Sequence, residues 1–230
     1  MIANFDFDVI RRSLGYLFFD GMTFTLMLTG LATCGGIIVG TLIAMMRLSG
    51  VWALSRIAQL YVDLTRSLPL VLVIFWFYFL VPYIGQWLTG ASRPVRVGAF
   101  ESSLLTFTLF EAAYFAEIMR AGIQSISRGQ PAAASALGLT YWQTMRYVVL
   151  PQAFRNMLPV LLTQTIVLFQ DTSLVYVLSI TDFLGAASKV AQRDGRLVEM
   201  YLFAALVYFV VSSIASFGVR RLQARIAIVR

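Results

Sequence analysis

Long apolar runs, three of them uncharged, alternate with short polar segments along the chain. Residues 22–46 form the first run, which is longer than the ~20 residues that a helix needs to cross a bilayer. Further apolar runs follow at residues 68–87, 102–119, 157–180 and 200–218. This pattern predicts an all-α integral membrane protein with about five transmembrane helices.

The segments that flank these spans differ from them in charge. Residues 1–21 mix Asp and Arg with Phe and Leu, which predicts an interfacial amphipathic segment. Acidic residues and the lack of a small-residue cleavage site argue against a removed signal peptide there. We expect residues 22–218 to form the transmembrane domain, with a cytoplasmic loop at 120–155, and residues 219–230 to form a basic cytoplasmic tail.

Composition excludes most enzyme chemistry. The 230 residues are 59% hydrophobic, with a mean hydropathy of +0.79, whereas soluble domains are about 45–50% apolar. A single cysteine, Cys34, rules out a disulfide framework, and the absence of histidine removes the commonest metal ligand and general base. The sequence has no phosphate-binding Gly-x4-Gly-Lys-Ser/Thr motif. We therefore expect no catalytic residue, no metal site and no cofactor bound by this chain.

The distribution of basic residues predicts the orientation in the membrane. Of the 18 Lys and Arg residues, eleven fall on one side of the predicted spans and seven on the other. The positive-inside rule then places the N-terminus outside and the C-terminus in the cytoplasm. The net charge of +7 could suggest a nucleic-acid partner, but in so apolar a chain we interpret the basic residues by their distribution across the membrane and expect no nucleic-acid partner.

A polar stretch at residues 111–151 carries dense helix punctuation. Ser127-Arg128-Gly129-Gln130 has the pattern of a capping box, and an Ala-rich helix is expected at Pro131–Leu137. Gly138 then stands where a helix ends in a left-handed residue. Thr140-Tyr141-Trp142-Gln143 predicts a second capping box, which starts a helix that stops before Pro151. Two short helices joined by a glycine predict a docking element.

These residues resemble a known motif. The cytoplasmic loop of ATP-binding-cassette importer permeases has the pattern Glu-Ala-Ala, three residues, Gly, nine residues, Ile, one residue, Leu-Pro. Ala133, Ala134, Gly138 and Leu150-Pro151 match it, with Val148 in the Ile position. Ala132 replaces the Glu, which removes one contact to a basic ATPase residue. GIQSISRGQ and LPQAFRN resemble the polar-amino-acid branch, and RSLPLVLVIFWFY and FQDTSLVYVLS are most similar to membrane subunits of glutamate/aspartate importers.

The resemblance covers essentially the whole chain and implies a type I importer permease with a MetI-like core in the bacterial inner membrane. It implies two ATP-binding-cassette ATPase subunits that hold ATP and Mg, and a periplasmic or extracellular amino-acid-binding protein. A related permease chain is the expected partner in a heterodimer, and a homodimer is the alternative. The residues expected to couple the chain to the ATPases are Gly129, Gln130, Ala133, Ala134, Leu137, Gly138, Leu150 and Pro151.

The fourth predicted span contains the candidates for a substrate path. Gln164, Gln170, Asp171 and Thr172 are polar residues in an apolar run, where charges are costly and usually face a partner or an aqueous path. Gln164, Leu168, Asp171 and Val175 share one helical face. An unpaired Asp171 would repel an acidic amino acid, which favours a structural role for it. Gln164 can donate and accept hydrogen bonds, so it is the better candidate for contact with the substrate.

Two other functions remain as alternatives. A secondary transporter or channel that works alone often contains inverted repeats or broken half-helices, and neither is visible in five unpaired spans. A membrane-anchored scaffold would explain the basic cytoplasmic face but not the polar residues inside the fourth span.

Cysteine labelling tests the orientation. In a Cys34→Ser background, single cysteines at Ser92 and Ser188 should react with a membrane-impermeant maleimide from outside. Cysteines at Ser127 and Gln223 should react only after the membrane is opened. Labelling of position 127 from the outer face would reverse the orientation and remove the loop from the cytoplasm.

Overall fold

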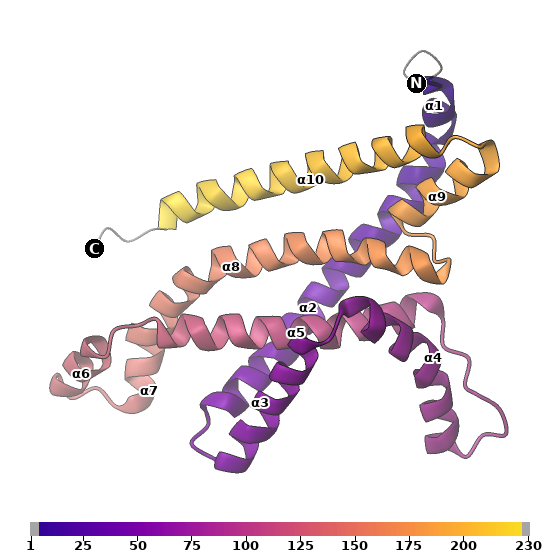
Figure 1. The fold of residues 1–230 in the computed structure, drawn as a ribbon. Coiled ribbons are helices and arrows are strands. Elements are labelled where there is room, and N and C mark those ends of the chain that lie inside the picture. The colour runs from indigo at the N-terminus through magenta and orange to yellow at the C-terminus, as the bar shows by residue number, and fades with distance from the viewer. Residues whose placement is uncertain (1–4, 227–230) are drawn as a thin grey trace. The chain divides into compact units, whose positions relative to one another are not determined.

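The structure is a computed structural model that describes residues 5–226. Residues 1–4 of the predicted interfacial segment and 227–230 of the predicted tail lie outside the described part. Between them the chain forms helices and connecting turns, without a strand (Figure 1). The α-helices are α1 (Phe7–Gly15), α2 (Thr23–Leu48), α3 (Trp52–Ser67), α4 (Leu70–Thr89), α5 (Ala99–Gln124), α6 (Gly129–Ala136), α7 (Tyr141–Thr144), α8 (Leu150–Asp171), α9 (Phe183–Asp194) and α10 (Leu197–Ile226). The all-α prediction is confirmed.

Four helical segments of the described chain are long and apolar enough to cross a membrane. They are Phe7–Leu48, Leu70–Thr89, Tyr141–Leu178 and Leu197–Ile226, and they overlap with four of the five predicted spans. The first is continuous because a π-helical segment, Tyr16–Met22, joins α1 to α2. The remaining predicted span, residues 102–119, lies in α5, which carries glutamates at 111 and 117 and is less apolar.

The chain folds into two compact units. The first unit comprises residues 1–34, 68–108 and 166–215, and the second comprises residues 35–67, 109–165 and 216–230.

α9 occupies part of the core of the first unit. Asp182 caps this helix by accepting hydrogen bonds from the N–H groups of Leu184 and Gly185 at 3.0 and 2.9 Å. Phe183 is fully buried, and its N–H donates to the Thr25 hydroxyl at 3.0 Å. The segment between the fourth and fifth predicted spans is therefore not simply a polar connection, because apolar residues at helical spacing pack one face of α9 into the core. Ser188 is buried with them, so the exposed Lys189 is the better labelling position.

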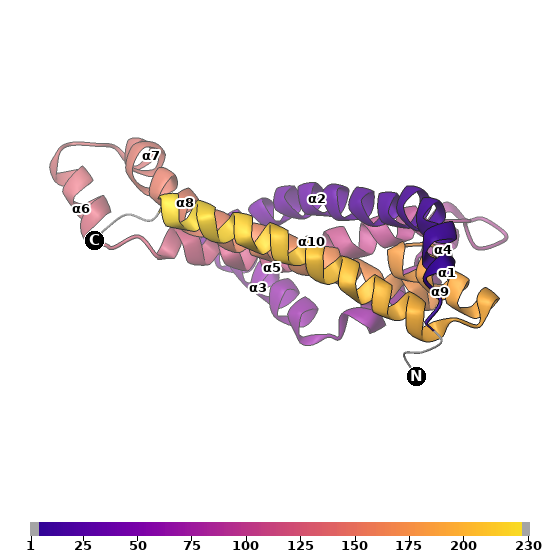
Figure 2. The same ribbon diagram turned by 90° about the horizontal axis from the view of Figure 1, so that it is seen from above.

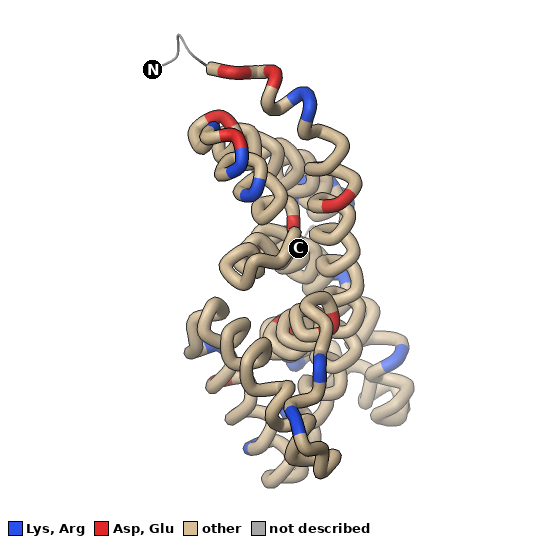
Figure 3. The backbone as a smooth tube through the Cα atoms, turned by 90° about the vertical axis from the view of Figure 1, so that its right-hand side faces the viewer, with Lys and Arg blue, Asp and Glu red and all other residues tan. Residues whose placement is uncertain are grey.

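Charged residues of the first unit pair where α1 meets the end of α9. Arg12 contacts Asp194 at 3.0 Å, and Arg196 lies 3.2 Å from Glu199 and 3.8 Å from Asp6. Figure 2 shows α1 beside α9, and Figure 3 shows acidic and basic residues of both segments close together. These pairs hold α1 against the end of α9 within the first unit. The interfacial position of residues 1–21 stays a prediction.

Close helix packing defines the second unit. An added Cβ on Gly40 would lie 2.9 Å from the Ala112 carbonyl oxygen and 2.9 Å from the Phe115 Cβ, so the glycine lets α2 approach α5. Phe115 is fully buried in a cluster with Ala44 and Leu161. Gly40 therefore has a packing role between α2 and α5.

Replacement of Gly40 tests this contact against a matched position. Gly40→Ala should lower the melting temperature of the purified protein, because forcing a methyl into a packed contact costs about 1–3 kcal/mol. Gly30→Ala, in the same helix with open space around its Cβ, should be neutral or slightly stabilising. Equal melting temperatures for the two variants would contradict the close approach of the helices.

Candidate functional site

The segment between α5 and α8 is the first candidate site, and it lies within the second unit (Figure 1). Its first helix, α6, spans Gly129–Ala136, close to the predicted 131–137. The capping box predicted at Ser127–Gln130 is wrong, because no side chain caps α6. Arg128 already has helical angles (φ −58°, ψ −22°), and the Ser127 carbonyl, rather than its hydroxyl, accepts from Gln130 at 3.0 Å.

The end of α6 follows the prediction. Gly138 has φ +81°, a left-handed conformation that a side chain with a Cβ rarely adopts. The N–H of Leu139 donates to the Ala134 carbonyl at 3.1 Å, and the N–H of Gly138 donates to Ser135 at 3.0 Å. This pair of hydrogen bonds is a Schellman motif, which satisfies the last carbonyls of α6.

The second capping box is confirmed. The Thr140 N–H donates to the Gln143 side chain at 2.8 Å, and the Gln143 N–H donates to the Thr140 hydroxyl at 3.4 Å. The helix does not stop before Pro151, however. A π-helical segment, Met145–Val149, leads from α7 into α8, which includes Pro151 in its first turn. Pro151 lies inside the continuous helical segment Tyr141–Leu178. Proline lacks an N–H, and it directly follows the π-helical turn, where the α-helical hydrogen-bond pattern is already interrupted.

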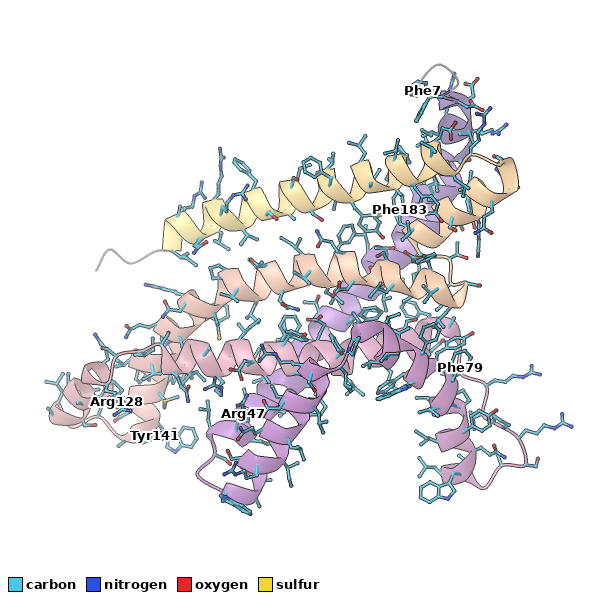
Figure 4. The ribbon with its side chains drawn as sticks, viewed as in Figure 1. Phe7, Arg47, Phe79, Arg128, Tyr141 and Phe183 are labelled. Atoms are coloured by element: carbon cyan, nitrogen blue, oxygen red, sulfur yellow. The ribbon has the colours of Figure 1, made fainter. Side chains whose placement is uncertain are left out.

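The loop carries exposed apolar side chains on short helical segments that pack against each other. Ala134 and Val149 are buried, so α6 is held against the π-helical segment. In contrast, Leu137 and Trp142 are 81% and 79% exposed, and the exposed ring of Tyr141 projects from the loop (Figure 4). The other predicted coupling residues, Gly129, Gln130, Ala133, Gly138, Leu150 and Pro151, are exposed as well. Of the predicted coupling residues, only Ala134 is buried.

The second candidate site consists of the polar side chains along α8 and the residues that they contact. In the second unit, the Gln164 side chain donates to both carboxylate oxygens of Glu111, at 3.1 and 3.4 Å. Glu111 is fully buried. Sequence analysis missed this pair: a carboxylate within an apolar run was a signal, but a partner 53 residues away has no fixed spacing.

The first unit holds the remaining polar residues of that stretch. Gln170 donates to the Ser212 hydroxyl at 3.0 Å, and the buried Thr172 donates to the Phe169 carbonyl at 2.7 Å. Asp171 is half-buried, and within the described chain no hydrogen bond or ion pair reaches its carboxylate. Beyond Asp171 the chain continues as a 3₁₀ helix, Thr172–Leu178, but Leu168 and Val175 are still buried in the same hydrophobic cluster.

An ion-pair network that the sequence analysis did not identify ties α2 to α5. Glu117 contacts Arg47 at the end of α2 and also Arg120 one turn along α5, and Arg120 contacts Gln124 as well. Arg47 is only 13% exposed. The network lies near the end of α5, before the loop that carries α6 and α7. It holds this end of α5 against the end of α2.

Comparison with a protein-family model identifies the architecture. The model described as "Binding-protein-dependent transport system inner membrane component" matches residues 36–228. Among curated proteins, the "Glutamate/aspartate import permease protein GltK" of Escherichia coli O6:H1 is 53% identical over 224 residues, which cover 97% of this chain and 99% of that protein. The "Glutamine transport system permease protein GlnP" of Escherichia coli K12 is 32% identical, with coverage of 98% and 99%.

Solved structures agree with this comparison. A chain from a crystal structure of "an amino acid ABC transporter with histidines" has a TM-score of 0.84 and 32% identity, covering 96% of this chain and 98% of its own. A chain of the MetNI methionine ABC transporter in an inward-facing conformation has a TM-score of 0.72 at 20% identity, with coverage of 93% and 97%. The second likeness shows the fold alone.

Proposed function

The chain belongs to the family of inner-membrane components of binding-protein-dependent transport systems, and on this premise we propose that it is the membrane-spanning permease subunit of an ATP-driven importer for glutamate and aspartate. The identity to a glutamate/aspartate import permease over nearly the whole chain is the observation that carries the substrate class. The glutamine permease is similar over the same length but much less identical, which supports an acidic rather than an amide side chain.

The loop at 129–151 is the coupling element in this proposal. The hydrogen bonds at Gly138 and the capping box at Thr140 satisfy backbone groups within the loop. The two short helices therefore move as a unit with the ends of α5 and α8 in this proposal. Leu137, Tyr141 and Trp142 present apolar surface that nothing in the described chain covers. Such a surface fits a groove on an ATPase subunit, and closure of two ATPases on ATP and Mg would pull on the helices through it.

The assembly follows from the family. ATPase and binding-protein partners are part of the system that this family serves. We propose two ATPase subunits, a related permease chain that completes the translocation path as a heterodimer, and an amino-acid-binding protein on the outer side. The alternative of a stand-alone secondary transporter or channel is not favoured, because it leaves the exposed surface of the loop without a role.

The substrate path is proposed along α8 and the 3₁₀ turn that follows it. Gln170 and Thr172 already make hydrogen bonds within the chain, which favours a supporting role for them. Gln164 is held by Glu111 through its amide N–H groups, so its amide oxygen is left to accept from a substrate ammonium. Asp171 has no partner in the described chain, and its partner is therefore the substrate's α-ammonium or a cation on another subunit.

Gly138 tests the coupling role. Gly138→Val should leave membrane insertion intact but abolish glutamate uptake and binding-protein-stimulated ATP hydrolysis, because a β-branched side chain is strongly disfavoured at φ +81°. Gly30→Val is the matched control: it lies outside the loop, its Cβ would meet open space and its φ is ordinary, so activity should be retained. Normal uptake by Gly138→Val, with glutamate, aspartate and glutamine each measured, would make the glycine incidental.

Substitutions in α8 test the path separately from the coupling. Gln164→Ala should leave a well-assembled complex with reduced uptake or altered preference among the three amino acids. Asp171→Asn should reduce uptake with assembly intact if the carboxylate holds the substrate ammonium, and should weaken subunit assembly in detergent if it pairs with another chain. Wild-type uptake by Gln164→Ala would remove that residue from the path.

A further inference from the structure

An open cavity lies at the turn between α2 and α3, wholly within the second unit. Its volume is about 270 Å³, and its walls include Arg47 and Arg56 as well as Ser49 and Ser55. Arg47, at the end of α2, is labelled in Figure 4. Two guanidinium groups in one cavity make it a candidate for an anion.

The two arginines are in different states. Arg47 is largely buried and contacts Glu117, which anchors its guanidinium in place. Arg56 is exposed, and among the residues that the structure describes no hydrogen bond or ion pair occupies it. Glu117 also pairs with Arg120, so its single negative charge does not neutralise the charges of both Arg47 and Arg56. The cavity therefore keeps uncompensated positive charge.

The start of α3 adds donors that the chain leaves unused. The Val51 carbonyl accepts from the Ser55 N–H at 3.0 Å, which makes Val51 the residue that precedes the helix. Valine has no side-chain acceptor, so it cannot cap the free N–H groups of the first turn as Ser, Thr or Asp would. These N–H groups and the positive end of the helix dipole stabilise a bound anion more than a neutral ligand.

The serines shape the turn rather than supply donors. The Ser49 hydroxyl donates to the Met46 carbonyl at 2.8 Å, and the Ser55 hydroxyl donates to the Arg47 carbonyl at 3.2 Å. Each hydroxyl has a single proton, which is spent on the backbone. The donors available in the cavity are thus the guanidinium of Arg56, the remaining N–H groups of Arg47 and the backbone at the start of α3.

We propose that this cavity binds a phosphate group, and that in the membrane the phosphate is the headgroup of an anionic phospholipid. Arg47 directly follows the uncharged run 22–46, so the cavity stands at the level of the headgroups where a span ends. Its rim includes Val51 and Trp52, which are 54% and 75% exposed, and tryptophan is enriched at membrane interfaces. A free phosphate ion makes no use of an apolar rim, whereas a lipid does.

The side of the membrane agrees with this ligand. The positive-inside rule places the α2–α3 turn in the cytoplasm, and the cytoplasmic leaflet is the one that attracts basic segments through its anionic lipids. The site is separate from the coupling loop and from the α8 residues, so it does not depend on their roles.

Native mass spectrometry of the assembled transporter in detergent tests the proposal, with phosphatidylglycerol, phosphatidylcholine and inorganic phosphate as separate probes. Wild type should retain phosphatidylglycerol in preference to phosphatidylcholine. Arg56→Gln should weaken phosphatidylglycerol binding roughly five-fold, the factor expected for one basic group at an anionic surface. Arg56→Lys, which keeps the charge, should restore most of it.

Arg225→Gln is the matched control, because it removes the same charge from an exposed position at the end of α10, on the same predicted side of the membrane. It should bind phosphatidylglycerol as wild type does. An equal loss in the Arg56 and Arg225 variants would mean attraction by net charge and would overturn the site. Arg56-dependent binding of inorganic phosphate, without Arg56 dependence for phosphatidylglycerol, would overturn the lipid as its source.

Discussion

Backbone N–H and C=O groups find no water in the hydrocarbon core of a bilayer, so a spanning segment must satisfy them within its own helix. The rest of this structure depends on that constraint. Hydroxyl side chains obey it as well: Thr29, Thr106 and Thr165 each donate to the carbonyl four residues earlier, at 2.7, 2.7 and 3.1 Å. Polar residues are thereby carried in apolar helices without needing a partner on another helix.

Charged side chains need a partner side chain, and two of the glutamates of α5 find partners on other helices. Glu111 of α5 is held by Gln164 of α8, and Glu117 of α5 holds Arg47 of α2. Both contacts lie in the second unit, beside the close α2–α5 packing that Gly40 permits. The glycine brings the helices near each other and the ion pair at Glu117 fixes their register. Asp171 departs from this rule within the described chain, and it is the residue of α8 that we assign to contacts beyond the chain.

The loop between α5 and α8 is held together by its own hydrogen bonds. A Schellman motif at Gly138 and a capping box at Thr140 satisfy the ends of its helices internally. Its buried contacts are small, and its large apolar side chains point outward. A loop built in this way keeps its shape when a partner pulls on it, which is the property that a coupling element needs.

The sequence by itself determined the helical class, the spans and the conformation at Gly138, because these follow from local hydrophobicity and from backbone sterics. It also determined the capping box at Thr140, whose two side chains are three residues apart. Tertiary structure decided the partner of Glu111, the Arg47–Glu117 pair and the burial of α9, since these join residues at no fixed spacing. It also decided that Pro151 lies within a helical segment instead of ending one, and that Ser127 does not cap α6. A local motif only offers a hydrogen bond, and the path of the chain between α5 and α8 determines whether that bond forms.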